Sequence, residues 1–228
     1  MQNEDRMKQV ILWRHGQTDW NTENRFQGHS DIPLNAVGHY QAKQAARILR
    51  DLEPTKIISS DLSRAFTTAG ALAELTGLEV LIDRRLRETH GGSWEGKTGA
   101  ENRANDYERF IRWIDGNDEP AGGDGEKRSE VAARATDAIL SSLKIDDPSL
   151  EERLVVVTHG GTARCVLGAL LDLPLLSWGS LGGLANASWS VLAQNHYAAD
   201  FRWLLAEHNA FTIPEPVLGE ESGGNDFV

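Results

Sequence analysis

The stretch that decides the fold is Leu154-Val155-Val156-Val157-Thr158-His159-Gly160-Gly161. Its first part is an uninterrupted β-branched and apolar run, which is typical of a parallel strand buried on both faces. A second short apolar run, 9–13, ends in a similar way at Arg14-His15-Gly16. A strand buried on both faces needs helices on both sides of its sheet. We therefore expect an α/β fold in three layers (α/β/α) with a mostly parallel central sheet.

The rest of the chain alternates between strand patterns and helix patterns, and neither an internal repeat nor a linker divides it. The periodicity predicts helices over 36–52, 61–77, 101–115, 128–143 and 160–174. It predicts further strands over 56–60, 80–82, 188–193 and 201–207. We expect one domain over residues 1–211, followed by an acidic, flexible tail over 212–228.

Charge and composition narrow the classes of partner. The 228 residues include 23 Lys and Arg against 34 Asp and Glu, a formal net charge of −11, which weighs against nucleic acid and anionic membranes. Cys165 is the only cysteine and cannot form an intrachain disulfide or a Cys-rich metal site. Neither a secretory leader nor an apolar run of about 18 residues is present, so we expect a cytoplasmic protein. A homodimer is left open.

Polar side chains follow four of the expected strands. Arg14 and His15 follow the first, Arg64 the second, Glu88 the third and His159 the fourth. In parallel sheets, ligands bind beyond the carboxyl ends of the strands. Guanidinium groups fit phosphate oxygens, a neutral imidazole can attack phosphorus, and a carboxyl group can protonate the leaving oxygen. The set therefore predicts phosphoryl transfer without a metal, because we find no carboxylate cluster suited to Mg²⁺.

Four motifs around these residues resemble the histidine phosphatase superfamily, which includes the cofactor-dependent phosphoglycerate mutases. They occur in the family's order and span residues 9 to about 194. The motifs are Leu12-Trp13-Arg14-His15-Gly16-Gln17-Thr18-Asp19-Trp20-Asn21, Ser59-Ser60-Asp61-Leu62-Ser63-Arg64-Ala65 with Thr68-Ala69, Arg85-Leu86-Arg87-Glu88, and Thr158-His159-Gly160-Gly161.

The resemblance implies three catalytic residues. His15 is the residue that becomes phosphorylated, Glu88 is the proton donor, and His159 belongs to the phosphate pocket. It also implies residues that bind the substrate, and His90 joins them because it follows Glu88 by two positions. This substrate-binding set is Arg14, Asn21, Gln27, Gly28, Arg64, His90 and Gly160, with Gly161 beside it. Neither a metal nor a cofactor is implied.

Residues after Glu88 indicate the branch of the family. Gly91 stands where the mutases have a tyrosine, and no paired arginines follow it to hold a second phosphate. Residues 85–90 and 181–189 resemble the bacterial glucosyl-3-phosphoglycerate phosphatases. We therefore expect a metal-independent phosphomonoesterase that acts through a phosphohistidine on a small phosphorylated metabolite, with glucosyl-3-phosphoglycerate as the first candidate.

Three other functions are weighed against this one: a cofactor-dependent phosphoglycerate mutase, a broad-specificity sugar-phosphate or phosphoprotein phosphatase, and an inactive protein that binds a phosphorylated ligand. The intact set of site residues argues against inactivity. Simpler roles are also open for single residues. Arg64 could pair with Asp61 on its own helix, and His29 has no motif around it and is interpreted as incidental.

Overall fold

The computed structural model describes residues 8–144, 147, 150–195 and 203–210. Its centre is one six-stranded sheet in the order β3-β2-β4-β1-β5-β6. The strands are β1 (Lys8–Arg14), β2 (Lys56–Ser59), β3 (Val80–Ile82), β4 (Glu152–Thr158), β5 (Trp189–Gln194) and β6 (Trp203–Ala210). The first four of these strands are parallel, whereas β5 is antiparallel to β1 and β6 is antiparallel to β5. The expected α/β fold with a mostly parallel sheet is confirmed.

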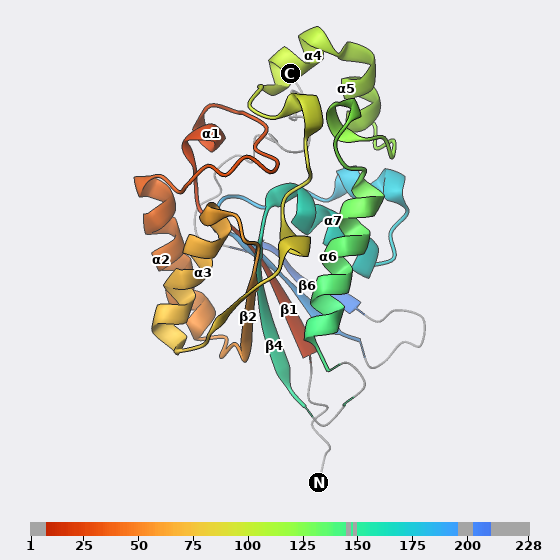
Figure 1. The fold of residues 1–228 in the computed structure, drawn as a ribbon. Coiled ribbons are helices and arrows are strands. Elements are labelled where there is room, and N and C mark those ends of the chain that lie inside the picture. The colour runs from red at the N-terminus through yellow and green to blue at the C-terminus, as the bar shows by residue number, and fades with distance from the viewer. Residues whose placement is uncertain (1–7, 145–146, 148–149, 196–202, 211–228) are drawn as a thin grey trace.

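Two pairs of helices cover the two faces of the sheet (Figure 1). Helices α2 (Ala36–Arg50) and α3 (Ser63–Thr76) lie on one face, and α6 (Arg128–Ser142) and α7 (Gly160–Leu170) lie on the other. Alternation along the strands supplies both faces, since successive side chains point to opposite sides. Ile11 therefore packs under α2 and α3, while Leu12 packs under α6 and α7.

A smaller, separate group of elements lies beyond the carboxyl ends of the strands. It includes α4 (Gly99–Asn105) and α5 (Tyr107–Ile114), which Figure 1 shows above the sheet. A cluster of buried apolar side chains holds this group together, namely Phe26, Trp94, Phe110, Trp113 and Ala121. We call these elements the cap.

The prediction of a single helix over 101–115 is wrong, because the structure has two helices there. Asp106 has φ −145° and ψ 49°, a conformation outside the helical region, and it separates α4 from α5. Its carboxylate instead accepts hydrogen bonds from Trp94 and Arg109 of the cap. The tertiary contacts of one aspartate thus break a helix that periodicity alone would continue.

The remaining elements are short. Helix α1 (Asp19–Thr22) follows β1, and the 3₁₀ turns are Arg84–Leu86, Gly92–Trp94, Ala121–Gly123 and Leu175–Ser180. No helix in the described residues is long and apolar enough to cross a membrane. The proposed tail, 212–228, and the start of the expected strand at 201–202 lie outside the described residues.

Candidate active site

Two histidines meet where β1 and β4 end. The rings of His15 and His159 are fully buried, with their centroids 5.1 Å apart. Nδ1 of His15 lies 2.7 Å from the carbonyl oxygen of Gly16. A carbonyl oxygen only accepts, so Nδ1 carries a proton, and in the neutral ring Nε2 therefore carries the lone pair. The site therefore holds His15 as the tautomer in which Nε2 can act as a nucleophile.

His159 is kept neutral by its surroundings. Burial, reinforced by the positive charge of Arg64, holds the pKa of His159 well below its usual value of 6.5. Nδ1 accepts a hydrogen bond from Nε of Arg64 at 3.2 Å, which leaves the proton on Nε2 to be donated to Oγ of Ser60 at 2.9 Å. A phosphoryl oxygen could receive that Nε2 proton in place of Ser60.

Arg64 joins α3 to the loop that follows α1. Its Nη1 donates to the carbonyl oxygen of Ser30 at 2.7 Å, and its Nη2 donates to that of Gly28 at 2.8 Å. Asp61, the alternative partner of Arg64, binds Arg87 at 2.6 Å. That hydrogen bond lowers the pKa of Asp61. Arg64 thus reaches the site from a helix whose acidic neighbour is engaged elsewhere.

Arg14 leaves the end of β1 and is almost completely buried. Its Nη1 donates to the carbonyl oxygen of Leu184 at 2.7 Å. Its Nε is buried, and no atom of the described residues accepts a hydrogen bond from it. Leaving such a donor unsatisfied costs about 1–3 kcal/mol, which an anionic oxygen next to it would recover.

Glu88 is held against the first turn of α7. Oε1 accepts from the backbone N–H of Thr89 at 2.7 Å and of Thr162 at 2.9 Å, and Oε2 accepts from that of Gly161 at 3.0 Å. The one hydroxyl proton of Thr162 lies between two acceptors, the carbonyl oxygen of Arg87 at 2.8 Å and Oε1 at 3.1 Å. These donors and the positive end of the helix stabilise the ionised carboxylate. A Cβ at Gly161 would lie 2.7 Å from Oε1, so this approach requires glycine.

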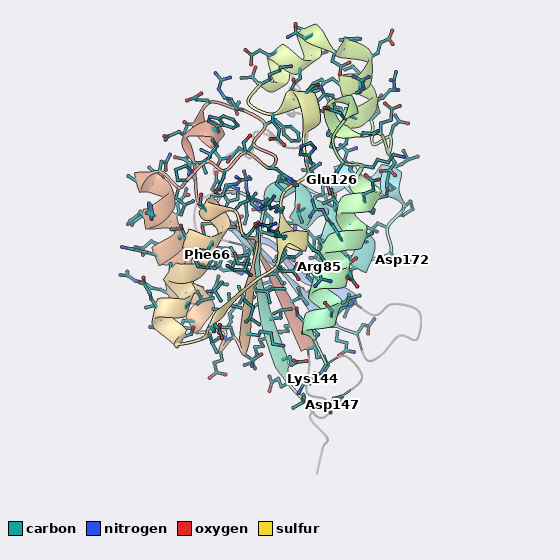
Figure 2. The ribbon with its side chains drawn as sticks, viewed as in Figure 1. Phe66, Arg85, Glu126, Lys144, Asp147 and Asp172 are labelled. Atoms are coloured by element: carbon teal, nitrogen blue, oxygen red, sulfur yellow. The ribbon has the colours of Figure 1, made fainter. Side chains whose placement is uncertain are left out.

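Arg134 of α6 fixes the backbone around Glu88. Its Nη1 donates to the carbonyl oxygens of Arg85 and Arg87 at 2.6 and 2.8 Å, and its Nη2 donates to that of Glu88 at 2.9 Å. Glu126 pairs with Arg134 at 2.7 Å, and Figure 2 labels Glu126 near the upper end of α6 and Arg85 lower along it. No motif surrounds Arg134, so its contacts with this backbone could not be predicted from the sequence.

The expected substrate-binding residues Asn21 and Gln27 belong to the segment that follows β1. Oδ1 of Asn21 accepts from the hydroxyl of Thr18 at 3.1 Å and from the amide of Asn186 at 3.0 Å, which fixes its side chain. Gln27 is fully buried, and neither atom of its amide has a hydrogen-bond partner among the described residues. Buried amides are rarely left unsatisfied, so Gln27 is suited to a polar ligand.

Gly28 and His29 lie in the loop that follows α1, and His29 reaches the backbone of Glu88. Gly28 has φ +51°, and a Cβ there would lie 2.1 Å from Glu95, which accepts hydrogen bonds from the backbone of His29 and Ser30. Nε2 of His29 donates to the carbonyl oxygen of Glu88 at 2.9 Å. Burial lowers the pKa of His29. Its interpretation as incidental is therefore wrong, and only the fold could reveal the role of His29 and Glu95.

His90 and Gly160 complete the expected set. The His90 side chain is 41% exposed at the rim, where its ring lies edge-on to His29 with centroids 5.0 Å apart. Gly160 is the first residue of α7, directly after His159. The fold thus brings the expected catalytic residues His15, Glu88 and His159 together at the carboxyl ends of β1 and β4.

The described residues contain no group of three or more His, Cys, Asp or Glu side chains that could hold a metal ion. Cys165 is buried on α7, and burial raises the pKa of its thiol to about 12. At neutral pH it is therefore a thiol and a poor nucleophile.

The chain is similar over most of its length to known proteins. The family model described as the histidine phosphatase superfamily (branch 1) matches residues 10–206. A glucosyl-3-phosphoglycerate phosphatase of Mycobacterium tuberculosis (strain H37Rv) is 41% identical over 217 residues, covering 90% of this chain and 96% of that protein. A probable phosphoglycerate mutase of Enterobacter sp. (strain 638) is 38% identical over 169 residues, covering 74% of this chain and 77% of that protein.

A solved structure is similar over the same length. The mycobacterial glucosyl-3-phosphoglycerate phosphatase complexed with VO3 superimposes with a TM-score of 0.79 at 40% identity. The match covers 89% of this chain and 99% of that one.

Proposed function

The chain belongs to the histidine phosphatase superfamily, and from this membership and the site we propose that it hydrolyses a small phosphorylated metabolite through phosphorylation of His15. The observation that carries the proposal is the hydrogen bond from Nδ1 of His15 to Gly16, because it directs the lone pair of Nε2 away from the backbone. The phosphatase activity is the same as that named for its relatives.

In the first step, Nε2 of His15 attacks phosphorus and the bond from phosphorus to the leaving oxygen breaks. Arg14 and Arg64 hold the phosphoryl oxygens, and the Nε2 proton of His159 donates to a third oxygen. Glu88 gives a proton to the leaving oxygen. Three backbone N–H groups stabilise the ionised carboxylate, so we infer that Glu88 takes up this proton when the anionic substrate binds beside it.

In the second step, water replaces the departed group. The Glu88 carboxylate, now ionised, accepts a proton from the water as its oxygen attacks phosphorus. The bond from phosphorus to Nε2 breaks, and its electron pair returns to His15. Inorganic phosphate leaves, and the tautomer set by Gly16 is restored.

We propose glucosyl-3-phosphoglycerate as the substrate. Relatives with that name are 39–41% identical across 90% of this chain. The alternative is a phosphoglycerate mutase, which the 38% identity to probable mutases favours. Gly91 argues against it, since a Cβ at this position would lie 2.5 Å from the buried ring of Phe26 and the site has no room for the mutase tyrosine.

Phosphate release from a panel of substrates tests the proposal. The panel contains glucosyl-3-phosphoglycerate, 3-phosphoglycerate, sugar phosphates and a phosphopeptide, with EDTA present and bisphosphoglycerate absent. We expect one strongly preferred substrate, metal-independent release and no release by His15→Ala. Isomerisation of 3-phosphoglycerate that requires bisphosphoglycerate would establish a mutase instead, and similar rates across the panel would establish a broad-specificity phosphatase.

Location and assembly complete the proposal. We infer a single-domain cytoplasmic enzyme without a nucleic-acid partner, which the net charge of −11 supports. The choice between a monomer and a homodimer is open, and light scattering during size-exclusion chromatography would decide it.

A further inference from the structure

Arg128, at the start of α6, is a buried cation with an unsatisfied N–H edge. The residue is 9% exposed, and its guanidinium carbon lies 4.0 Å from the centre of the Trp113 ring. Stacking of this kind orients the guanidinium plane but supplies no acceptor for its N–H groups. Its Nη1 is buried and has no hydrogen-bond partner among the described residues. An acceptor is therefore missing at this edge.

The electrostatic surroundings of Arg128 are unfavourable for a cation. It is the first residue of a 15-residue helix, where the helix dipole is positive. Burial, together with the positive charge of Arg164 on α7, lowers the pKa of Arg128 to about 10. Asp118 attracts it, but the carboxylate of Asp118 already accepts hydrogen bonds from the backbone and hydroxyl of Ser129. A bound anion would stabilise the charged form of Arg128.

Helix α7 carries Arg164 one turn beyond its contact with Glu88. The backbone N–H of Gly161 donates to the Glu88 carboxylate, and Arg164 follows three residues later, about one helical turn along α7. Its neighbour Cys165 is buried against Val131 and Ala132 of α6. Arg164 therefore lies where the upper part of α7 meets α6.

Helix α6 brings Arg128 to the same place. Arg128 precedes Val131 by one turn, and it follows Glu126 by two residues. Glu126 accepts the backbone N–H of His90 at 2.8 Å, just beyond Glu88. The charges of Arg128, Arg164 and Glu88 all act on the Cys165 thiol. The two arginines thus approach from two helices on the Glu88 side of the site.

This is the side on which the leaving group must lie, because Glu88 protonates the leaving oxygen. A 3-phosphoglycerate moiety carries a carboxylate two carbons away from the carbon that bears the phosphate ester. Guanidinium groups bind carboxylates through charge-assisted hydrogen bonds. We propose that Arg128 and Arg164 form a second anion subsite, which binds the carboxylate of the leaving group; this inference rests on the proposed function.

Two substrates that differ only at this group test the subsite. 3-Phosphoglycerate and glycerol 3-phosphate share one carbon skeleton, but only the first has a carboxylate. For the wild-type enzyme we expect kcat/KM to be about 10- to 100-fold higher for 3-phosphoglycerate, the effect of one or two charge-assisted hydrogen bonds. Arg128→Met and Arg164→Met should each reduce this ratio toward one. Arg153→Met, at the opposite end of β4, is the matched control and should keep the wild-type ratio.

Thermal unfolding without substrate separates this role from a structural one. A merely structural Arg128 predicts that Arg128→Met lowers Tm and leaves the substrate ratio unchanged, which would overturn the subsite. The subsite predicts that Tm stays equal or rises, because methionine removes an unpaired buried charge and can still pack on Trp113. If Arg128→Met does not fold, the ratio for Arg164→Met decides.

The other outcomes are also distinct. A wild-type enzyme that hydrolyses both substrates equally overturns the subsite but keeps the proposed phosphatase. Propane-1,3-diol bisphosphate offers a phosphate in place of the carboxylate. If both arginine variants lose more kcat/KM on this compound than on 3-phosphoglycerate, the subsite prefers phosphate and the carboxylate assignment is overturned. Absence of phosphate release from every substrate would instead overturn the proposed function.

Discussion

The middle of the sheet and its carboxyl edge are made by the same strands but have opposite chemistry. In β4, the residues from Leu154 to Val157 are buried among apolar side chains on both faces. Thr158 and His159, which follow directly, are equally buried but polar. The middle stabilises the fold through apolar burial and the hydrogen bonds between strands, whereas the edge keeps donors such as Nε of Arg14 and the amide of Gln27 unsatisfied by the described residues. The comparison teaches that stability and reactivity are separated along the length of each strand.

The largest expected effect is a loss of activity at the carboxyl edge of the sheet. His15→Ala removes the nucleophile, so kcat should fall by at least about 10⁴-fold, as in other enzymes that lose theirs. The Tm should change little, because the alanine leaves the apolar layers intact. Steady-state kinetics and thermal unfolding check both halves of this prediction. A residual rate within 100-fold of wild type would show that His15 is not the nucleophile.

The second effect depends on the substrate. Glu88→Gln removes the proton donor, and we expect kcat to fall about 10²–10⁴-fold on an alkyl phosphate, the usual contribution of general acid catalysis. On p-nitrophenyl phosphate the loss in phosphorylation should be smaller, because p-nitrophenolate leaves without a proton. Single-turnover rates of leaving-group release on the two substrates measure this difference. Equal losses would contradict the assignment of Glu88 as the acid.

The third effect concerns the middle of the sheet, where a substitution should lower stability and leave activity unchanged. Leu49 of α2 is fully buried in the apolar layer under β1, so Leu49→Ala should reduce the free energy of unfolding by about 2–5 kcal/mol. Chemical denaturation measures this loss. The kcat/KM of the folded protein should match wild type; a tenfold fall would mean that the two regions are not separable.

The smallest effect is on the pH dependence of stability, to which the active-site residue His159 contributes. His159 stays neutral in the folded protein, but in the unfolded chain it takes up a proton below about pH 6.5. The unfolded state then binds more protons, so the free energy of unfolding decreases as pH falls below 6.5, with a slope of up to about 1.4 kcal/mol per pH unit for this residue. His159→Gln should flatten the dependence between pH 6.5 and 5. His39→Gln, at an exposed position, is the control; equal slopes in all three proteins would contradict the prediction.

The sequence predicted the sheet, its flanking helices and the residues at its carboxyl edge, because buried strands and their ends leave local patterns. Asn35 illustrates this: asparagine is a favoured N-cap residue, and here it precedes α2 and accepts the backbone N–H of Gly38 at 2.9 Å. The break at Asp106 could not be predicted, since it depends on contacts with the cap.

The supporting residues of the site were missed for a related reason. Arg134 and Glu95 act by holding backbone atoms from other segments, and a backbone contact leaves no motif in the sequence. The pairing of Asp61 with Arg87 instead of Arg64 likewise follows from the course of the chain after β3. Residues that touch a ligand can be found from their chemistry, but residues that position them require the fold.

The central claim is that the edge reacts through Nε2 of His15, and trapping the phosphoenzyme tests it most directly. The wild-type enzyme is mixed with glucosyl-3-phosphoglycerate, quenched in alkali within milliseconds, and the attached phosphate is located by ³¹P NMR and by mass spectrometry of peptides. We predict an acid-labile phosphate on Nε2 of His15, absent from His15→Ala. A phosphate on Nδ1 or on another residue, or phosphate release without any covalent phosphate, would contradict the account.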